Sequence, residues 1–133
     1  MATTHARVLN LGLQLAAIRH AFPAAIGHVQ RGKLICTVPL QPTAASRTYT
    51  VRLSHRHGKR PQVEVIGPQL ELHPEADRVP HVYPGDHLCL YYGREWNDSL
   101  LLAHTVLPWA SEWLLYYELW IATGTWHGGG TTH

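Results

Sequence analysis

The sequence predicts an α+β fold in which helices pack against an antiparallel β-meander. Three observations support this prediction: an amphipathic helical pattern near the N-terminus, several β-branched segments separated by short turns, and a second helical pattern near the C-terminus. The chain has 133 residues, the usual size of one domain, and can bury most of its apolar surface without the help of disulfides or metal ions. We therefore expect a single domain over residues 1–133.

The first helix is expected to end at Pro23. Apolar side chains recur at spacings of four, three and four residues at Leu11, Leu15, Ile18 and Phe22. This spacing places them in one stripe along a helix. Proline cannot continue the backbone hydrogen bonds, so the helix ends there.

Three strands are expected next. The segment Lys33 to Val38 is rich in β-branched residues, "RTYTVRLSH" from Arg47 alternates in polarity, and "QVEVIG" follows the turn "RHGKR". Turns that contain proline, serine or glycine separate these segments, which favours an antiparallel meander.

A long irregular segment and a second helical region follow. No periodicity is visible from Pro68 to Asp86, and loops of this length are often functional. The helical region is expected to have its N-cap just before Leu100, at Asn97, Asp98 or Ser99. One apolar face is then formed by Leu107, Ala110, Leu114, Tyr117 and Ile121.

Two residues punctuate this helical region. Pro108 is expected to start a new helical segment or to kink the old one, and Gly124 is expected to end the helix. The tail "WHGGGTTH" is expected to be flexible from about residue 128 onward.

The composition argues against nucleic acid and membrane as partners. The formal net charge is +2, charged residues make up 15%, and the basic residues are scattered apart from a cluster at Arg52, Arg56, Lys59 and Arg60. That cluster is typical of a solvated hairpin, and the alternative is a dock for an acidic partner. The apolar stretch from Leu100 to Ile121 contains a proline and two glutamates, which argues against a membrane span.

Cysteine and histidine usage predicts a cytoplasmic protein without metal or cofactor. Two cysteines are too few for a disulfide framework, although a single bridge stays open, and the N-terminus lacks the layout of a secretory signal. The eleven histidines form no recognised ligand pattern. Cys36, inside an expected strand, is interpreted as structural.

The segment "VPHVYPGDHLCLYYGREW", residues 79–96, resembles the active-site segment of the ubiquitin-conjugating enzymes. That family has a His-Pro-Asn triplet, a hydrophobic residue, a glycine-containing turn, an Ile-Cys-Leu-like stretch and then a tryptophan. The matching positions here are Val79, Pro80 and His81, then Val82, Gly85 with Asp86, Leu88 to Leu90 around Cys89, and, within a residue, Trp96. Only Pro80 of the triplet is identical, because valine replaces the histidine and histidine replaces the asparagine.

The C-terminal "LPWASEWLLYYELWIATGTWHGGG" narrows the resemblance. It looks like the bacterial conjugating-enzyme homologues associated with CBASS antiphage defence, which have tryptophan-rich helices and a glycine-rich end. The resemblance implies a cysteine that forms a thioester with the C-terminus of a cGAS-like nucleotidyltransferase and passes it to an amine. It also implies a possible activating enzyme as a second partner.

Four residues are candidates for this chemistry. Cys89 is the expected nucleophile, partly exposed in a loop after a turn, and the alternative is a buried apolar role. His81 is expected to donate to the carbonyl oxygen or to act as a base, and otherwise caps the loop. His87 lies two residues before Cys89, so in an extended segment both side chains would point to the same side. The alternative is that His87 faces solvent. Asp86 would orient an imidazole or act on the attacking lysine, or serve the turn alone.

Two other functions remain open. One is a binding module with the same fold and no catalysis; the retained Cys89 counts against it. The other is a Cys-His thiol hydrolase with His81 as its base, which lacks an obvious orienting acid. The surplus of tryptophan and tyrosine near the C-terminus fits either the core or a protein interface.

Overall fold

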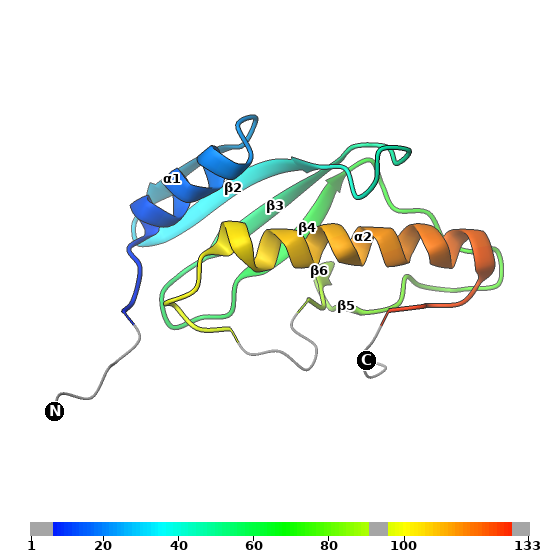
Figure 1. Cartoon of the computed structure of the whole chain (residues 1–133). Helices are drawn as coiled ribbons and strands as arrows, with labels where there is room; N and C mark the ends of the chain where they lie inside the picture. The colour runs from blue at the N-terminus through cyan, green and yellow to red at the C-terminus, as the bar shows by residue number, and fades with distance from the viewer. Residues whose placement is uncertain (1–6, 91–95, 129–133) are drawn as a thin grey trace, which may run out of the picture.

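The computed structural model describes residues 7–90 and 96–128, and it confirms the α+β architecture (Figure 1). An N-terminal helix, a four-stranded antiparallel sheet, a short hairpin and a C-terminal helix follow one another. The elements are α1 (Leu11–Ala21), β1 (Ile26–Gln30), β2 (Lys33–Leu40), β3 (Tyr49–His55), β4 (Gln62–Gly67), β5 (Val82–Tyr83), β6 (His87–Leu88), the 3₁₀ helix η1 (Leu102–His104) and α2 (Val106–Thr123).

The sheet is a meander with the strand order β1-β2-β3-β4, and its first strand was not predicted. β1 is an edge strand whose residues are mostly exposed, so its sequence lacks an apolar alternation. Arg31 and Gly32, which join it to β2, have φ angles of 53° and 72°. Positive φ at both turn residues is typical of tight hairpins, since this turn matches the twist of the strands.

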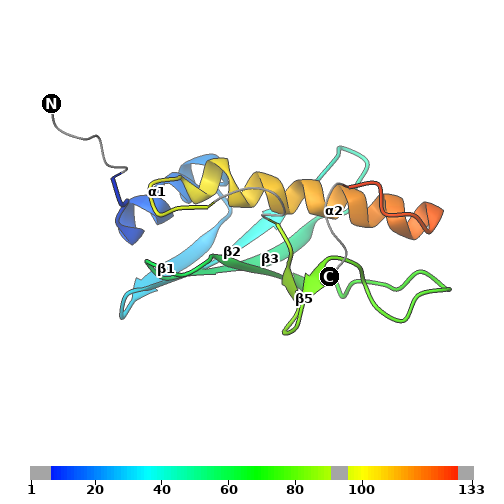
Figure 2. The ribbon, with the colours of Figure 1, turned by 90° about the horizontal axis from the view of Figure 1, so that it is seen from below.

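Both long helices cover the same face of the sheet (Figure 2). The side chains of β2 and β3 alternate, and one face of each strand is buried beneath the helices. Cys36 lies fully buried on that face, so its structural interpretation is confirmed. Leu11, Leu15 and Ile18 of α1 are buried against the same core, as their spacing predicts.

The prediction of an N-cap at residues 97–99 is wrong, because α2 begins only at Val106. Gln14 of α1, itself 1% exposed, explains the delay. Its amide nitrogen donates to the carbonyl of Leu100 at 2.7 Å, and its amide oxygen accepts from the N–H of Leu102 at 2.9 Å. The carbonyl of Leu100 is therefore bonded to α1, and the N–H of His104, which it would accept in a helix that starts at Leu100, donates to Leu101 instead.

Helix α2 runs through Pro108 without interruption and ends as predicted at Gly124. Pro108 lies in the first turn of the helix, where the missing N–H has no partner to lose. Gly124 has a φ of 78° and donates its N–H to the carbonyl of Trp120 at 2.7 Å. Trp113 and Trp120 are buried in the core. No helix within residues 7–90 and 96–128 is long and apolar enough to cross a membrane.

Candidate functional site

The candidate cysteine follows a two-stranded hairpin that is shaped by its turn. Tyr83 of β5 pairs with His87 of β6, and the N–H of Asp86 donates to the carbonyl of Tyr83 at 3.1 Å. Pro84 and Gly85 occupy the centre of this turn, and Gly85 has a φ of 89°. Proline followed by a glycine with positive φ is the pattern of a type II turn. The predicted turn at Gly85 and Asp86 is therefore confirmed.

His81 anchors Cys89 through the backbone. The N–H of Cys89 donates to the carbonyl of His81 at 3.0 Å, and the indole N–H of Trp113 donates to the same carbonyl at 3.1 Å. His81 has a φ of 56°, in the left-handed region, where asparagine and histidine are more frequent than most residues. The third position of the triplet thus holds the cysteine against the hairpin and against α2.

The thiol of Cys89 is less accessible than the sequence predicts. Cys89 is 6% exposed, between the buried Leu88 and Leu90, so the expectation of a partly exposed thiol is wrong for this structure. Its Sγ donates to the phenol oxygen of Tyr83 at 3.4 Å. The hairpin brings this phenol onto the sulfur, which accounts for part of the burial. Cys89 and Cys36 are both free thiols, so the possible bridge between them is not formed.

Tyr83 and Arg60 are site residues that the sequence analysis missed. Nη1 of Arg60, in the turn between β3 and β4, donates to the phenol oxygen of Tyr83 at 3.3 Å. The hydrogen bond with Cys89, followed by burial, raises the pKa of Tyr83, while Arg60 acts in the opposite direction. A signal for Tyr83 was present in the sequence, because a hairpin across Pro-Gly-Asp places residue 83 opposite residue 87 and therefore on its face.

The ring of His81 packs against the segment that follows α2. The centroids of His81 and Trp126 are 4.9 Å apart with an interplanar angle of 37°, and Trp126 also lies 5.3 Å from the ring of Trp113. Gly128 fits closely beside Trp126, since a Cβ there would lie 2.7 Å from Nε1 of Trp126 and 2.7 Å from Cδ2 of Tyr116. The start of "WHGGG" is thus packed near the candidate site. The prediction of a flexible tail from about residue 128 onward is untested for residues 129–133, which lie outside the described residues, while Gly128 itself is closely packed.

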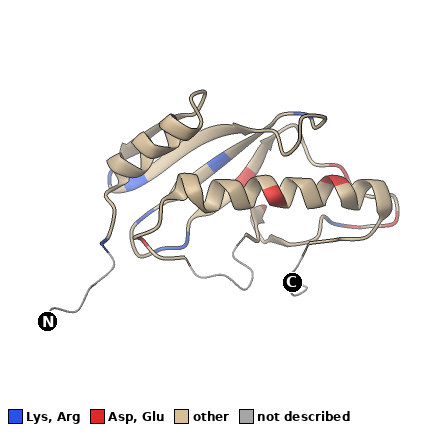
Figure 3. Cartoon of the chain, viewed as in Figure 1, with Lys and Arg blue, Asp and Glu red and all other residues tan. Residues whose placement is uncertain are grey.

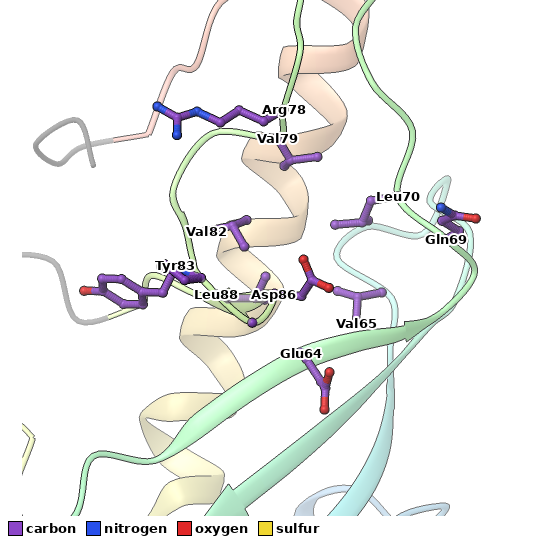
Figure 4. Close-up of a pocket in the computed structure, with 12 residues that line it drawn as sticks. Glu64, Val65, Gln69, Leu70, Arg78, Val79, Val82, Tyr83, Asp86 and Leu88 are labelled. Atoms are coloured by element: carbon purple, nitrogen blue, oxygen red, sulfur yellow. The ribbon is translucent and has the colours of Figure 1, made fainter.

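His87 and Asp86 lie on different sides of the hairpin. His87 is the cross-strand partner of Tyr83, so both side chains leave the hairpin on one face, and the phenol reaches Cys89. The imidazole of His87 folds over the turn, with its Cε1 3.6 Å from where a Cβ on Gly85 would lie. Asp86 is exposed at its backbone turn, and its carboxylate points toward Val65 of β4 (Figure 4).

A pocket of about 630 Å³ lies between the hairpin and β4. Figure 4 shows Asp86 and Leu88 on its hairpin side; Tyr83 also lines the pocket, and its hydroxyl end points away from it. Its aliphatic lining consists of Val65, Leu70, Val79, Val82 and Leu88. The charged residues Glu64, Arg78 and Asp86 also belong to the lining. The pocket therefore has a largely apolar lining. The carboxylate of Asp86 faces it from the hairpin, on the side away from the hydroxyl of Tyr83.

Trp96 and Asp98 fix the chain where it returns to the fold after the cysteine. Trp96 meets the buried ring of His55 edge-on, with centroids 5.6 Å apart and an angle of 88°. The carboxylate of Asp98 lies 3.3 Å from Nε2 of His55 and accepts the N–H of Gly58 at 2.8 Å. This contact also holds the turn that carries Arg60.

Figure 3 shows Lys and Arg spread over several elements of the described part of the chain. Within the predicted basic cluster, Arg52 pairs with Glu64 at 2.6 Å and Arg56 donates to the carbonyl of Arg31 at 3.0 Å. Arg60 instead reaches the hairpin. In the described part of the chain, no three His, Cys, Asp or Glu side chains are gathered to hold a metal ion.

Comparison with known families supports the resemblance at the family level. The family model for the Type II CBASS E2 protein matches residues 14–133, nearly the whole chain. No curated protein matches the chain. The matched region contains the hairpin, Cys89 and the tryptophan-rich helix. The chain therefore belongs to the Type II CBASS E2 protein family, a family of E2-like proteins of CBASS defence.

Proposed function

We propose that this protein is a ubiquitin-conjugating-like transferase, a single domain in which Cys89 carries an acyl group as a thioester. The acyl group is the C-terminus of a partner protein, a cGAS-like nucleotidyltransferase, and the acceptor is an amine. The observation that carries this proposal is the hydrogen bond of 3.0 Å from the N–H of Cys89 to the carbonyl of His81. It links the cysteine to the third position of the triplet, in a member of an E2 family.

The proposed chemistry has two acyl transfers. In the first, the thiolate attacks the activated C-terminal carbonyl carbon, a carbon–sulfur bond forms, and the activating group leaves with its electron pair. In the second, an amine attacks the thioester, a carbon–nitrogen bond forms, sulfur leaves as thiolate, and the amine proton passes to a base. An activating enzyme supplies the first leaving group in this proposal.

Three neighbouring residues have proposed roles. His81 places the cysteine through its carbonyl, and its imidazole is the candidate base for the incoming amine. His87 shares the face of the hairpin on which Tyr83 meets the thiol, and its proposed role is to favour the thiolate form of Cys89. Asp86 turns toward the pocket, so its proposed role is to attract a cationic group of the acceptor there (Figure 4).

The 6% exposure of Cys89 favours one alternative, a non-catalytic binding module. A transferase requires two macromolecules to reach the sulfur in turn, so the side chains over it must move. Alkylation separates the two functions, since a transferase cysteine reacts with iodoacetamide in the folded protein at pH 8. Complete protection of Cys89 under these conditions would favour the binding module.

The test of the proposed function compares two cysteine variants after co-expression with the nucleotidyltransferase and activating enzyme of the same defence system. Cys89→Ala is expected to abolish a thiol-labile adduct on a non-reducing gel. Cys36→Ala, the matched control in the core, is expected to retain it. An adduct that survives in Cys89→Ala and disappears in Cys36→Ala contradicts the assignment.

A further inference from the structure

We propose that Tyr83, held in place by Arg60, donates the hydrogen bond that stabilises the Cys89 thiolate when it forms and when it leaves. This inference rests on the proposed transferase function and assigns a catalytic role to a residue outside the triplet resemblance. Its basis is a row of three groups from two hairpins, in which guanidinium, phenol and thiol follow one another at 3.3 Å and 3.4 Å.

The phenol can serve both protonation states of the sulfur. A tyrosine hydroxyl has one hydrogen to donate and lone pairs to accept. In the resting state, its oxygen accepts from Arg60 and from the thiol of Cys89. When the thiol loses its proton, the hydroxyl rotates and donates its own hydrogen to the sulfur anion, a charge-assisted bond that is stronger than the neutral one.

Arg60 fixes the direction of the hydrogen bonds in this row. A guanidinium is always protonated and has no acceptor, so the tyrosine oxygen can only accept from it. Electron density drawn toward Arg60 makes the phenol hydrogen a better donor toward sulfur. The pKa of Tyr83 is raised, first by the hydrogen bond with Cys89 and then by burial, so the phenol keeps the proton that it must offer.

The benefit appears in both acyl transfers. In the first, the donor stabilises the attacking thiolate before the carbon–sulfur bond forms. In the second, that bond breaks as the carbon–nitrogen bond forms, and sulfur leaves with the electron pair beside the phenol. The tyrosine changes no covalent bond of its own and returns to accept from the thiol after reprotonation.

His81 is placed for a different task. Its carbonyl is already bonded to the N–H groups of Cys89 and Trp113, and its ring packs on Trp126 at 4.9 Å. The sulfur of Cys89 bonds to the hydroxyl of Tyr83 at 3.4 Å. His81 therefore holds the backbone of Cys89, and Tyr83 contacts its sulfur.

The experiment measures alkylation of Cys89 by iodoacetamide at pH 7 and pH 10, with the site assigned by peptide mass. Tyr83→Phe removes only the hydroxyl and is expected to slow alkylation at pH 7 about tenfold, as expected for loss of a hydrogen bond to a charged group. At pH 10, which is above the pKa of about 8.5 of a free cysteine, the rate is expected to change less than twofold. Lys59→Gln, which removes a charge from the turn that carries Arg60, is the control and is expected to match the wild type.

Arg60→Gln tests whether the arginine acts through the tyrosine. Its expected slowing at pH 7 is about threefold, and the double variant with Tyr83→Phe is expected to react no more slowly than Tyr83→Phe alone. Circular dichroism and thermal unfolding establish that each variant is folded. Because Arg60→Gln leaves Tyr83 itself unchanged, it also tests the proposal if Tyr83→Phe is unstable.

The outcomes separate this inference from the proposed function. An unchanged or faster alkylation rate at pH 7 in Tyr83→Phe overturns the donor role, because the phenol then only shields the sulfur from solvent. The adduct that depends on Cys89, and with it the proposed function, is unaffected by this result. Additive losses in the double variant overturn the action of Arg60 through Tyr83. Complete protection of Cys89 in the wild type overturns both the donor role and the transferase function.

Discussion

The left-handed backbone of His81 provides a quantitative test of how the cysteine is held. Its φ of 56° aims one carbonyl at the N–H groups of Cys89 and Trp113. An ordinary L-residue pays about 1–2 kcal/mol in this region, and a β-branched residue is a genuine outlier there. Replacing the histidine by valine therefore adds roughly 1 kcal/mol of backbone cost.

The same change removes the ring contact between His81 and Trp126. Such pairs contribute about 0.5–1.5 kcal/mol beyond their buried area. His81→Val is therefore expected to lose about 2 kcal/mol in the free energy of unfolding, or roughly 8 °C in Tm. His81→Asn keeps the backbone conformation and loses only the ring, so about 1 kcal/mol is expected.

Urea unfolding at pH 7.5 measures these differences, and the rate of adduct formation provides the functional comparison. The expected order of stability is wild type, then asparagine, then valine, with adduct formation by His81→Asn within about threefold of the wild type. A valine variant as stable as the asparagine variant would refute the backbone role. A loss of adduct formation of about 100-fold in His81→Asn would instead assign that step to the imidazole.

Two further predictions concern stability. Gln14→Ala leaves the carbonyl of Leu100 and the N–H of Leu102 without their partner, so it is expected to cost about 3 kcal/mol in urea unfolding. His20→Ala on the exposed side of the same helix is expected to stay within about 0.5 kcal/mol of the wild type, and equal losses would contradict the bridging role. Burial lowers the pKa of His55 below its ordinary 6.5, so the folded protein holds this imidazole neutral. The unfolded state takes up a proton at His55 below pH 6.5, so the free energy of unfolding falls as the pH drops below 6.5, by at most about 1.4 kcal/mol per pH unit. His55→Gln is expected to make the plot of unfolding free energy against pH flatter in this range. A wild-type protein more stable at pH 5 than at pH 7.5 would contradict this sign.

Local patterns predicted the elements whose shape depends on their own residues. Leu11, Leu15 and Ile18 follow a helical spacing, and all three are buried in α1. Gly124 ends α2, because only its own backbone conformation is involved. The start of α2 could not be predicted, since Gln14, 86 residues away from Leu100, bonds to the backbone there.

In the candidate site, too, features set by local sequence could be predicted and contacts between distant segments could not. The position of Cys89 after a turn and a short strand follows from a local motif and could be predicted, whereas its burial could not. The contact of Tyr83 with Arg60 joins two hairpins, and the contact of His81 with Trp126 joins a loop to the end of a helix. No spacing along the chain encodes such contacts, because they depend on the packing of the whole fold.

The central claim is that Cys89 itself carries the acyl group, and a serine trap tests it most directly. Cys89→Ser is to be co-expressed with the nucleotidyltransferase and activating enzyme, and its intact mass measured under reducing conditions. We expect a reductant-stable ester with the mass of both proteins minus one water, mapped by peptide fragmentation to residue 89. An unmodified Cys89→Ser protein, together with a wild-type adduct that maps to Cys36 or to a lysine, would contradict it.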